Sequence, residues 1–146
     1  MQDSSLAGDV APVFQAFSGL GDGIEARWRA LDYAESAFPE LAAEALRYAD
    51  LPAALRLDDV LRAAVASPRL PWQRDPASRF GDPALTLYDG SRFHIDVYVW
   101  FSSTTALHQH AFAGAFQVLE GASIHGHYTF ATSREVNPHF RLGRIS

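Results

Sequence analysis

The spacing of the hydrophobic residues changes near the middle of the chain. In the first half, apolar residues recur every three or four positions with charged residues between them, which is the period of an amphipathic helix. These positions are Ile24, Trp28, Leu31 and Phe38 in one stretch and Leu41, Ala42, Ala45, Leu46 and Ala49 in the next. The pattern predicts two consecutive helices, each with one buried face.

Residues that cap or break helices mark the ends of these stretches. Asp22 is a candidate N-cap for the first helix, and Pro39 can end that helix and begin the second. A further short apolar stretch follows Leu51-Pro52, and Asp58 or Asp59 can cap it as a third helix.

Two neighbouring segments are less regular. The apolar cluster at residues 10–17 fits either a short helix or a docked arm. Residues 67–83 carry four prolines in turn-forming contexts, which predicts an extended surface linker, with Trp72 and Phe80 expected to anchor it. We therefore predict a helical region over residues 1–70.

From residue 84 onward the hydrophobic period is two, which is typical of β-strands. The hairpin signal Asp89-Gly90 follows a first strand at residues 84–88. The next strand alternates Phe93, Ile95, Val97, Val99 and Phe101 with His94, Asp96, Tyr98 and Trp100. Further strands are expected at residues 105–110, 115–119, 123–131 and 140–145, with turns at Glu120-Gly121 and Asn137-Pro138. The fold class predicted is α+β, with antiparallel strands over residues 71–146.

Composition narrows the classes of protein that fit. The chain has 146 residues, 48% of them hydrophobic, a length and composition that fit one domain with a sizeable core. The net charge of −5 and the absence of a clustered basic patch argue against a nucleic-acid partner. No apolar run is long enough for a membrane helix, and the first residues lack a signal-peptide pattern. The absence of cysteine excludes disulfides and thiolate metal sites, and it fits a cytoplasmic location.

All the histidines lie in the second half of the chain, where two pairs have the spacing of a metal-chelating site. His108 and His110 are two positions apart, so a strand would place both imidazoles on one face, ready to bind a borderline metal. His125 and His127 repeat this spacing and are candidates for a third ligand. His-x-His on a strand is also compatible with an ordinary surface or packing role, and we interpret His94 and His139 as ordinary polar positions.

The region around His108 resembles the cupin superfamily. The first cupin motif begins with a glycine, continues through His-x-His and a glutamate, and ends in a glycine. Here Ser102 stands at the first position, Gly114 stands where the glutamate is expected, and Gly121 closes the motif. The resemblance covers about residues 84–131 and implies a jelly-roll barrel.

Within the superfamily the chain looks most like the cysteine dioxygenase, or thiol dioxygenase, branch. Residues 93–100 resemble the strand that precedes the motif there, and residues 116–121 resemble the end of the motif. The resemblance implies a mononuclear non-haem Fe(II) dioxygenase acting on a small molecule, with His108 and His110 as ligands. Tyr98 and Trp100 are candidates for substrate binding. The alternative is a non-catalytic cupin module that binds a small molecule or assembles, without a metal.

Two departures from that branch matter. Residues 85–88 contain no arginine to hold a substrate carboxylate, which disfavours a cysteine-like substrate. Nothing in residues 134–146 matches the second cupin motif, Pro-x-Gly-x-x-His. We therefore expect a barrel that is incomplete at the C-terminus, either in a fragment or in a protein that completes its sheet with another chain. An open sheet edge would favour a homo-oligomer.

Overall fold

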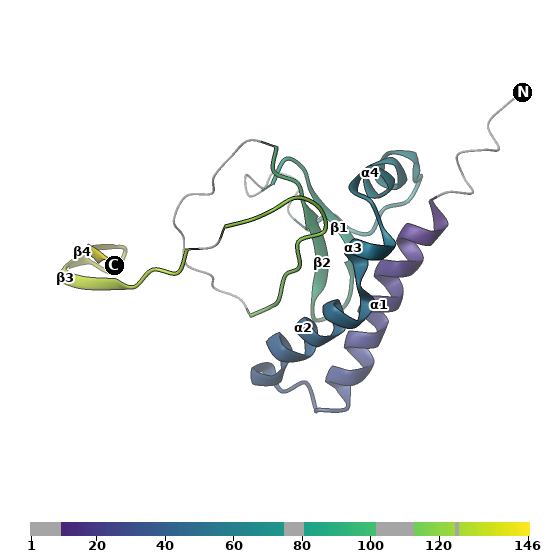
Figure 1. Ribbon diagram of the computed structural model, residues 1–146. Helices are drawn as coiled ribbons and strands as arrows, with labels where there is room; N and C mark the ends of the chain where they lie inside the picture. Colours follow the sequence, from purple (N-terminus) through teal and green to yellow (C-terminus); the bar gives the residue numbers. More distant parts are fainter. Residues whose placement is uncertain (1–9, 75–80, 102–112, 125) are drawn as a thin grey trace, which may run out of the picture.

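The protein combines helices with two small antiparallel sheets (Figure 1). Its structure, a computed structural model, describes residues 10–74, 81–101, 113–124 and 126–146. The helical elements are α1 (Ala11–Arg29), the 3-10 turn η1 (Glu35–Ala37), α2 (Phe38–Ala49), α3 (Leu51–Ala54) and α4 (Leu57–Ala66). The strands are β1 (Ala84–Asp89), β2 (His94–Tyr98), β3 (Phe130–Asn137) and β4 (Phe140–Ile145). The predicted mixture of helix and antiparallel sheet is confirmed.

Helix α1 begins much earlier than the sequence pattern indicated. The expected start at Asp22 is wrong, because Asp22 lies inside the helix and the cluster at residues 10–17 forms its first turns. The buried residues of α1 keep helical spacing through its glycines; they are Val13, Phe17, Leu20, Gly21, Ile24 and Trp28. Burial of this continuous apolar face offsets the low helix propensity of the glycines.

The helix boundaries agree with the prediction only in part. Helix α1 ends at Arg29, because Asp32 and Tyr33 adopt positive φ angles of 51° and 56° and turn the chain. Helix α2 starts with Pro39 in its first turn, as expected. Asp58 and Asp59 lie in the first turn of α4 and do not cap it by a side-chain hydrogen bond.

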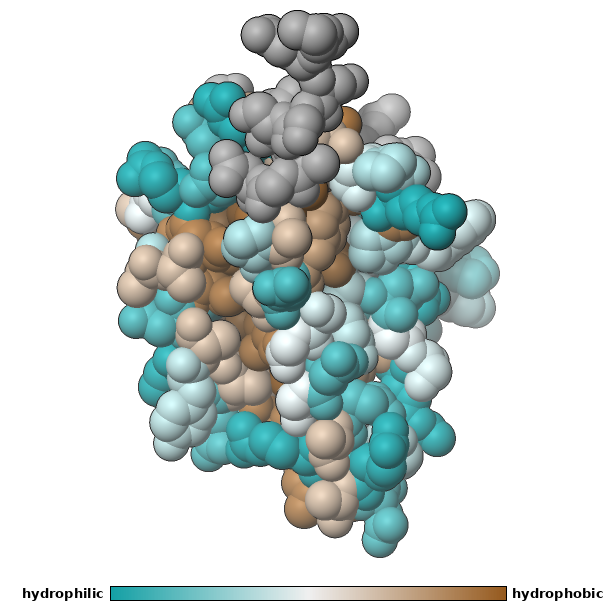
Figure 2. Space-filling model, turned by 90° about the vertical axis from the view of Figure 1, so that its right-hand side faces the viewer, coloured by the Kyte–Doolittle hydropathy of each residue, from teal (hydrophilic) through white to brown (hydrophobic). Residues whose placement is uncertain are grey.

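The core lies between α1, α2, α4 and the β1–β2 hairpin. The Trp28 ring packs against Phe38 at a centroid distance of 4.4 Å and against Phe93 at 6.4 Å. Its indole N–H donates to the Ala34 carbonyl at 2.9 Å, which satisfies the polar atom of a largely buried ring. Because Phe93 immediately precedes β2, this aromatic cluster joins the hairpin to the helices. Figure 2 shows the helical side of the molecule, where hydrophilic side chains surround exposed apolar patches.

Strands β1 and β2 form the predicted antiparallel hairpin around Asp89-Gly90. The pairing runs from Ala84 opposite Tyr98 to Asp89 opposite His94. The preceding extended segment is held to β1 by Gln73 and not by Trp72, whose side chain is 75% exposed. The expectation that Trp72 anchors this segment is therefore wrong, and Phe80 lies outside the described residues.

The C-terminal part is less strand-rich than predicted. Strands β3 and β4 pair around the expected turn at Asn137-Pro138, and all their residues are exposed. The strand expected at residues 115–119 is irregular chain, and the one expected at 123–131 becomes regular only at Phe130. Alternating hydrophobicity is insufficient there because no described strand lies alongside to accept the hydrogen bonds.

The two sheets are separate and have two strands each, and the described residues form no closed barrel. In Figure 1 the β3–β4 hairpin lies apart from the helices and from β1–β2. The strand expected at 105–110 falls outside the described residues. Within the part of the chain that the structure describes, no helix is both long and apolar enough to cross a membrane.

Candidate ligand-binding face of strand β2

The histidines proposed as metal ligands lie mostly outside the described residues. This holds for His108, His110 and His125. His127 is described, and it is exposed on irregular chain ahead of β3. Across the described ranges, no three His, Cys, Asp or Glu side chains gather closely enough to hold a metal ion.

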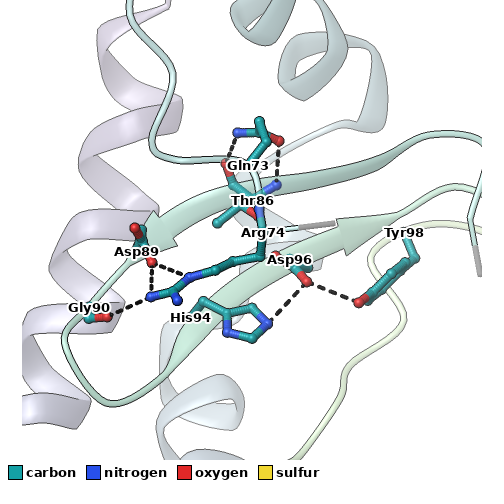
Figure 3. A network of polar contacts seen from close by, with 8 residues as sticks. All are labelled: Gln73, Arg74, Thr86, Asp89, Gly90, His94, Asp96 and Tyr98. Atoms are coloured by element: carbon teal, nitrogen blue, oxygen red, sulfur yellow. Dashed lines mark hydrogen bonds and ion pairs between the residues drawn. The ribbon is translucent and has the colours of Figure 1, made fainter. Parts of the chain in front are cut away.

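Strand β2 presents a polar face directly ahead of the His-x-His segment. Its alternation turns Ile95 and Val97 toward the core, which leaves His94, Asp96 and Tyr98 on the opposite face. Asp96 lies between the other two side chains, as Figure 3 shows. Its Oδ2 accepts a hydrogen bond from the Tyr98 hydroxyl at 2.9 Å and lies 3.3 Å from His94 Nε2.

The Asp96 carboxylate is nearly buried but only half satisfied. Its side chain is 11% exposed, and the solvent-inaccessible Oδ1 has no hydrogen-bond partner among the described residues. A buried carboxylate oxygen without a donor is costly, and in native proteins it usually indicates a bound water, an ion or a functional role. Asp96 can therefore accept further hydrogen bonds on this face.

Tyr98 and Trp100 extend the polar face with aromatic surface. Their rings are stacked with centroids 5.7 Å apart and planes inclined by 18°. The two residues are 36% and 45% exposed. The structure thus places both candidate substrate-binding residues side by side, with the Tyr98 hydroxyl against Asp96.

The two described arginines nearest to the hairpin in sequence, Arg74 and Arg92, contact groups other than Asp96. Arg74 binds the Asp89 carboxylate and donates to the Gly90 carbonyl at 3.2 Å. The guanidinium carbon of Arg92 lies 4.0 Å from the centre of the Tyr33 ring, in a cation–π contact. No described arginine pairs with Asp96.

The pairing of His94 with Asp96 was missed by sequence reasoning, which interpreted His94 as an ordinary polar position. The signal was present, because His94, Asp96 and Tyr98 alternate along a strand whose other residues are aliphatic. Alternation predicts which side chains share a face of the strand. It does not distinguish a partly buried polar face from a solvent-exposed one. The distinguishing fact is the burial of Asp96, which depends on the fold.

The segment that ends at Gly121 contacts the helices. Gly121 has a φ of 86°, a left-handed conformation suited to glycine, so the turn predicted at Glu120-Gly121 is confirmed. Leu119 packs on the hydrophobic core, and Glu120 Oε2 accepts a hydrogen bond from the Leu57 backbone N–H at 3.2 Å. The segment that follows the His-x-His motif is therefore attached to the start of α4.

No family model, curated protein or solved structure matches this chain.

Proposed function

We propose that the chain is a cupin-like small-molecule-binding domain related to the mononuclear non-haem iron dioxygenases. The observation that carries this proposal is His108-x-His110 followed by Gly121, in the order typical of the first cupin motif. The thiol dioxygenase branch remains the most similar one, and an incomplete jelly roll is the architecture that we propose for residues 71–146.

Three structural features support the proposal. A helical layer precedes an antiparallel hairpin, as the resemblance implies. The apolar face of β2 packs on the helices, so its polar face points to the side where a pocket would lie. Gly121 forms a turn with positive φ at the position that closes the motif.

The donor set suits iron. Neutral imidazoles are good ligands for Fe(II), and facial three-ligand sites leave positions open for a substrate and oxygen. His108 and His110 would hold the ion, with His125 or His127 as the third ligand. When bound, the ion would supply the redox chemistry of oxygen insertion.

The chain's own residues would bind and position the substrate. Tyr98 and Trp100 would form an apolar wall that excludes water from one side of the ligand. Asp96, held by Tyr98 and His94, would accept a hydrogen bond that orients the ligand. These roles belong to the polar face of β2 and do not depend on which third histidine completes the site.

Metal analysis of purified protein tests the proposal. We expect about one iron per chain after anaerobic loading with Fe(II), and loss of that iron in His108→Ala and His110→Ala. His139→Ala is the matched control, because His139 lies at the β3–β4 turn and should leave the iron content unchanged. Oxygen uptake with a small-molecule substrate would then identify a dioxygenase.

The alternative, a binding or assembly module without a metal, predicts a different result. A folded protein that takes up no iron, or whose iron content does not depend on His108, would favour that module. Equal loss of iron in the His139 control would indicate non-specific binding and count against the site.

We also propose self-association through an open strand edge, in a cytoplasmic protein. The outer edge of β1 is covered at Thr86 by Gln73, so β1 is a poor edge for a partner. The β3–β4 hairpin is a better candidate, because all its residues are exposed and apolar Phe130, Phe140 and Ile145 are each about half exposed. Sedimentation of the wild type against Phe140→Lys tests this, with a shift toward monomer expected for the variant.

A further inference from the structure

We infer that the polar face of β2 binds the positively charged nitrogen of a small amine, with Asp96 as the counter-charge and Tyr98 and Trp100 as an aromatic wall. The inference rests on the proposed function, in which this face lines the substrate pocket, and it names the substrate class.

Asp96 contributes a negative charge to this face that no described arginine pairs with. Asp96 is the carboxylic acid of β2. Arg74 lies on the same face of the hairpin (Figure 3) but pairs with Asp89, the residue opposite His94. Arg92 contacts the Tyr33 ring. A ligand carboxylate would therefore be repelled by Asp96, which no described arginine neutralises. A ligand ammonium would meet an opposite charge in a nearly desolvated position, where ion pairing is stronger than in bulk water.

The hydrogen-bonding capacity of the Asp96 carboxylate also favours an ammonium group. An ionised carboxylate is acceptor-only and offers about four lone-pair sites. Asp96 Oδ2 already faces two donor groups, at 2.9 and 3.3 Å, whereas Oδ1 receives no hydrogen bond from any described residue. An ammonium group carries three N–H donors and can fill these sites.

The stacked rings supply the second half of a cation site. A cation within about 6 Å of an aromatic ring centre is attracted by the ring quadrupole. The Tyr98 hydroxyl contacts Asp96, and the Tyr98 ring stacks on Trp100, so carboxylate and aromatic faces are contiguous. The His94 side chain is 44% exposed, and rotation of its ring away from Asp96 would open the carboxylate to the ligand.

Three probes of the same shape test the inference: benzylammonium, benzyl alcohol and phenylacetate. Each is titrated into chelator-treated, ¹⁵N-labelled protein, and binding is followed by the shifts of backbone amides 94–100 and the Trp100 indole N–H. We expect benzylammonium to bind at least tenfold more tightly than benzyl alcohol, with phenylacetate the weakest. Equal affinity for the three probes, or shifts confined to other residues, would overturn the inference.

Two variants locate the charge. Asp96→Asn should lose at least tenfold in affinity for benzylammonium while keeping its affinity for benzyl alcohol. Asp59→Asn makes the same charge change at an exposed position of α4 and should bind as the wild type does. Equal losses in both variants would overturn a specific role for Asp96. Should Asp96→Asn not fold, the order of the three probes on the native protein decides the question.

Failure of this inference is distinguishable from failure of the proposed function. Iron held through His108 together with no preference for the ammonium probe would overturn the amine site and leave the iron site standing. Preference for the ammonium probe in a protein that takes up no iron would support the amine site and contradict the proposed iron site.

Discussion

Glu120 Oε2 accepts a hydrogen bond from the backbone N–H of Leu57, with 3.2 Å between the two atoms. Leu57 is the first residue of α4, whose N-terminal N–H groups receive no side-chain cap from Arg56 at the N-cap position. Glu120 is 63 residues away along the chain, so this contact supplies from a distance the anion that a helix N-terminus favours. It also ties the segment that ends at Gly121 to the helices.

We therefore predict that Glu120→Ala lowers the free energy of unfolding by about 1 kcal/mol, the typical contribution of a capping side chain. Glu120→Gln should lower the free energy of unfolding by less, because the amide keeps an acceptor for the Leu57 N–H although it lacks the charge. Urea denaturation measures both variants. Glu135→Ala is the control, since the Glu135 side chain forms a 3.9 Å exposed ion pair with Arg141 and caps no helix among the described residues. Equal effects at positions 120 and 135 would show that the distant cap contributes nothing.

The glycines of α1 should respond differently to alanine. A Cβ at Gly21 would overlap the Tyr88 ring, whereas a Cβ at Gly19 or Gly23 would meet no atom within 4 Å. Gly21→Ala is expected to destabilise the protein by about 1–3 kcal/mol through overpacking. Gly19→Ala and Gly23→Ala are expected to stabilise it by about 0.5–1 kcal/mol, because alanine is the better helix former.

Thermal and urea unfolding of these three variants check the prediction. The same substitution on the same helix makes each variant a control for the others, so helix propensity cancels in the comparison. Stabilisation by Gly21→Ala would show that the close approach of Tyr88 to α1 does not occur in solution.

The same glycines explain why part of the fold could be predicted and part could not. The helical period in residues 24–49 and the hairpin at Asp89-Gly90 are local signals, and both lead to observed elements. The beginning of α1 was missed because glycine ordinarily disfavours helices. What makes glycine suitable at position 21 is the Tyr88 ring, a contact that no local pattern contains.

For the strands and the site as well, local sequence patterns do not contain the long-range contacts that decide the structure. Ile124 and Tyr128 have strand-like spacing, but alternation does not supply a neighbouring strand, and both residues are exposed in irregular chain. In the site, sequence spacing put Tyr98 and Trp100 on one face, and the structure shows them stacked. The roles of His108 and His110 remain a prediction from the motif.

Tyr88 should give the protein a measurable sensitivity to alkaline pH. Burial raises the pKa of Tyr88, and the Asp22 carboxylate, 3.3 Å from its hydroxyl, raises that pKa further. The unfolded chain has the ordinary tyrosine pKa of about 10. Above that pH the unfolded state loses the proton before the folded state does, so stability falls as the pH rises toward the folded pKa.

Below about pH 10 the contribution of protonated Tyr88 to stability is fully present, so the loss of stability appears only at more alkaline pH. We expect Tyr88→Phe to show a smaller loss of stability between neutral and alkaline pH than the wild type in urea denaturation. Tyr48→Phe is the matched control, because Tyr48 is 81% exposed and should keep the wild-type pH dependence. Identical pH profiles for Tyr88→Phe and wild type would contradict the raised pKa.

Gln73 should protect the outer edge of β1. Its side-chain amide donates to the Thr86 carbonyl at 2.9 Å and accepts from the Thr86 N–H at 3.0 Å, which reproduces the pairing of a neighbouring strand (Figure 3). Gln73→Ala removes both bonds and exposes the edge to solvent. Since each such bond contributes about 1 kcal/mol, we expect a loss of about 1–3 kcal/mol in the free energy of unfolding. We also expect faster hydrogen exchange at the Thr86 amide.

Gln73→Glu separates the two bonds. The carboxylate keeps the acceptor for the Thr86 N–H but has no donor for the Thr86 carbonyl, so exchange at Thr86 should stay slower than in Gln73→Ala although stability still falls. Gln15→Ala, at an exposed position of α1, should leave both readouts at the wild-type values. Fast exchange at Thr86 in the wild type itself would mean that Gln73 does not cover the edge, and β1 would then become a second candidate surface for self-association.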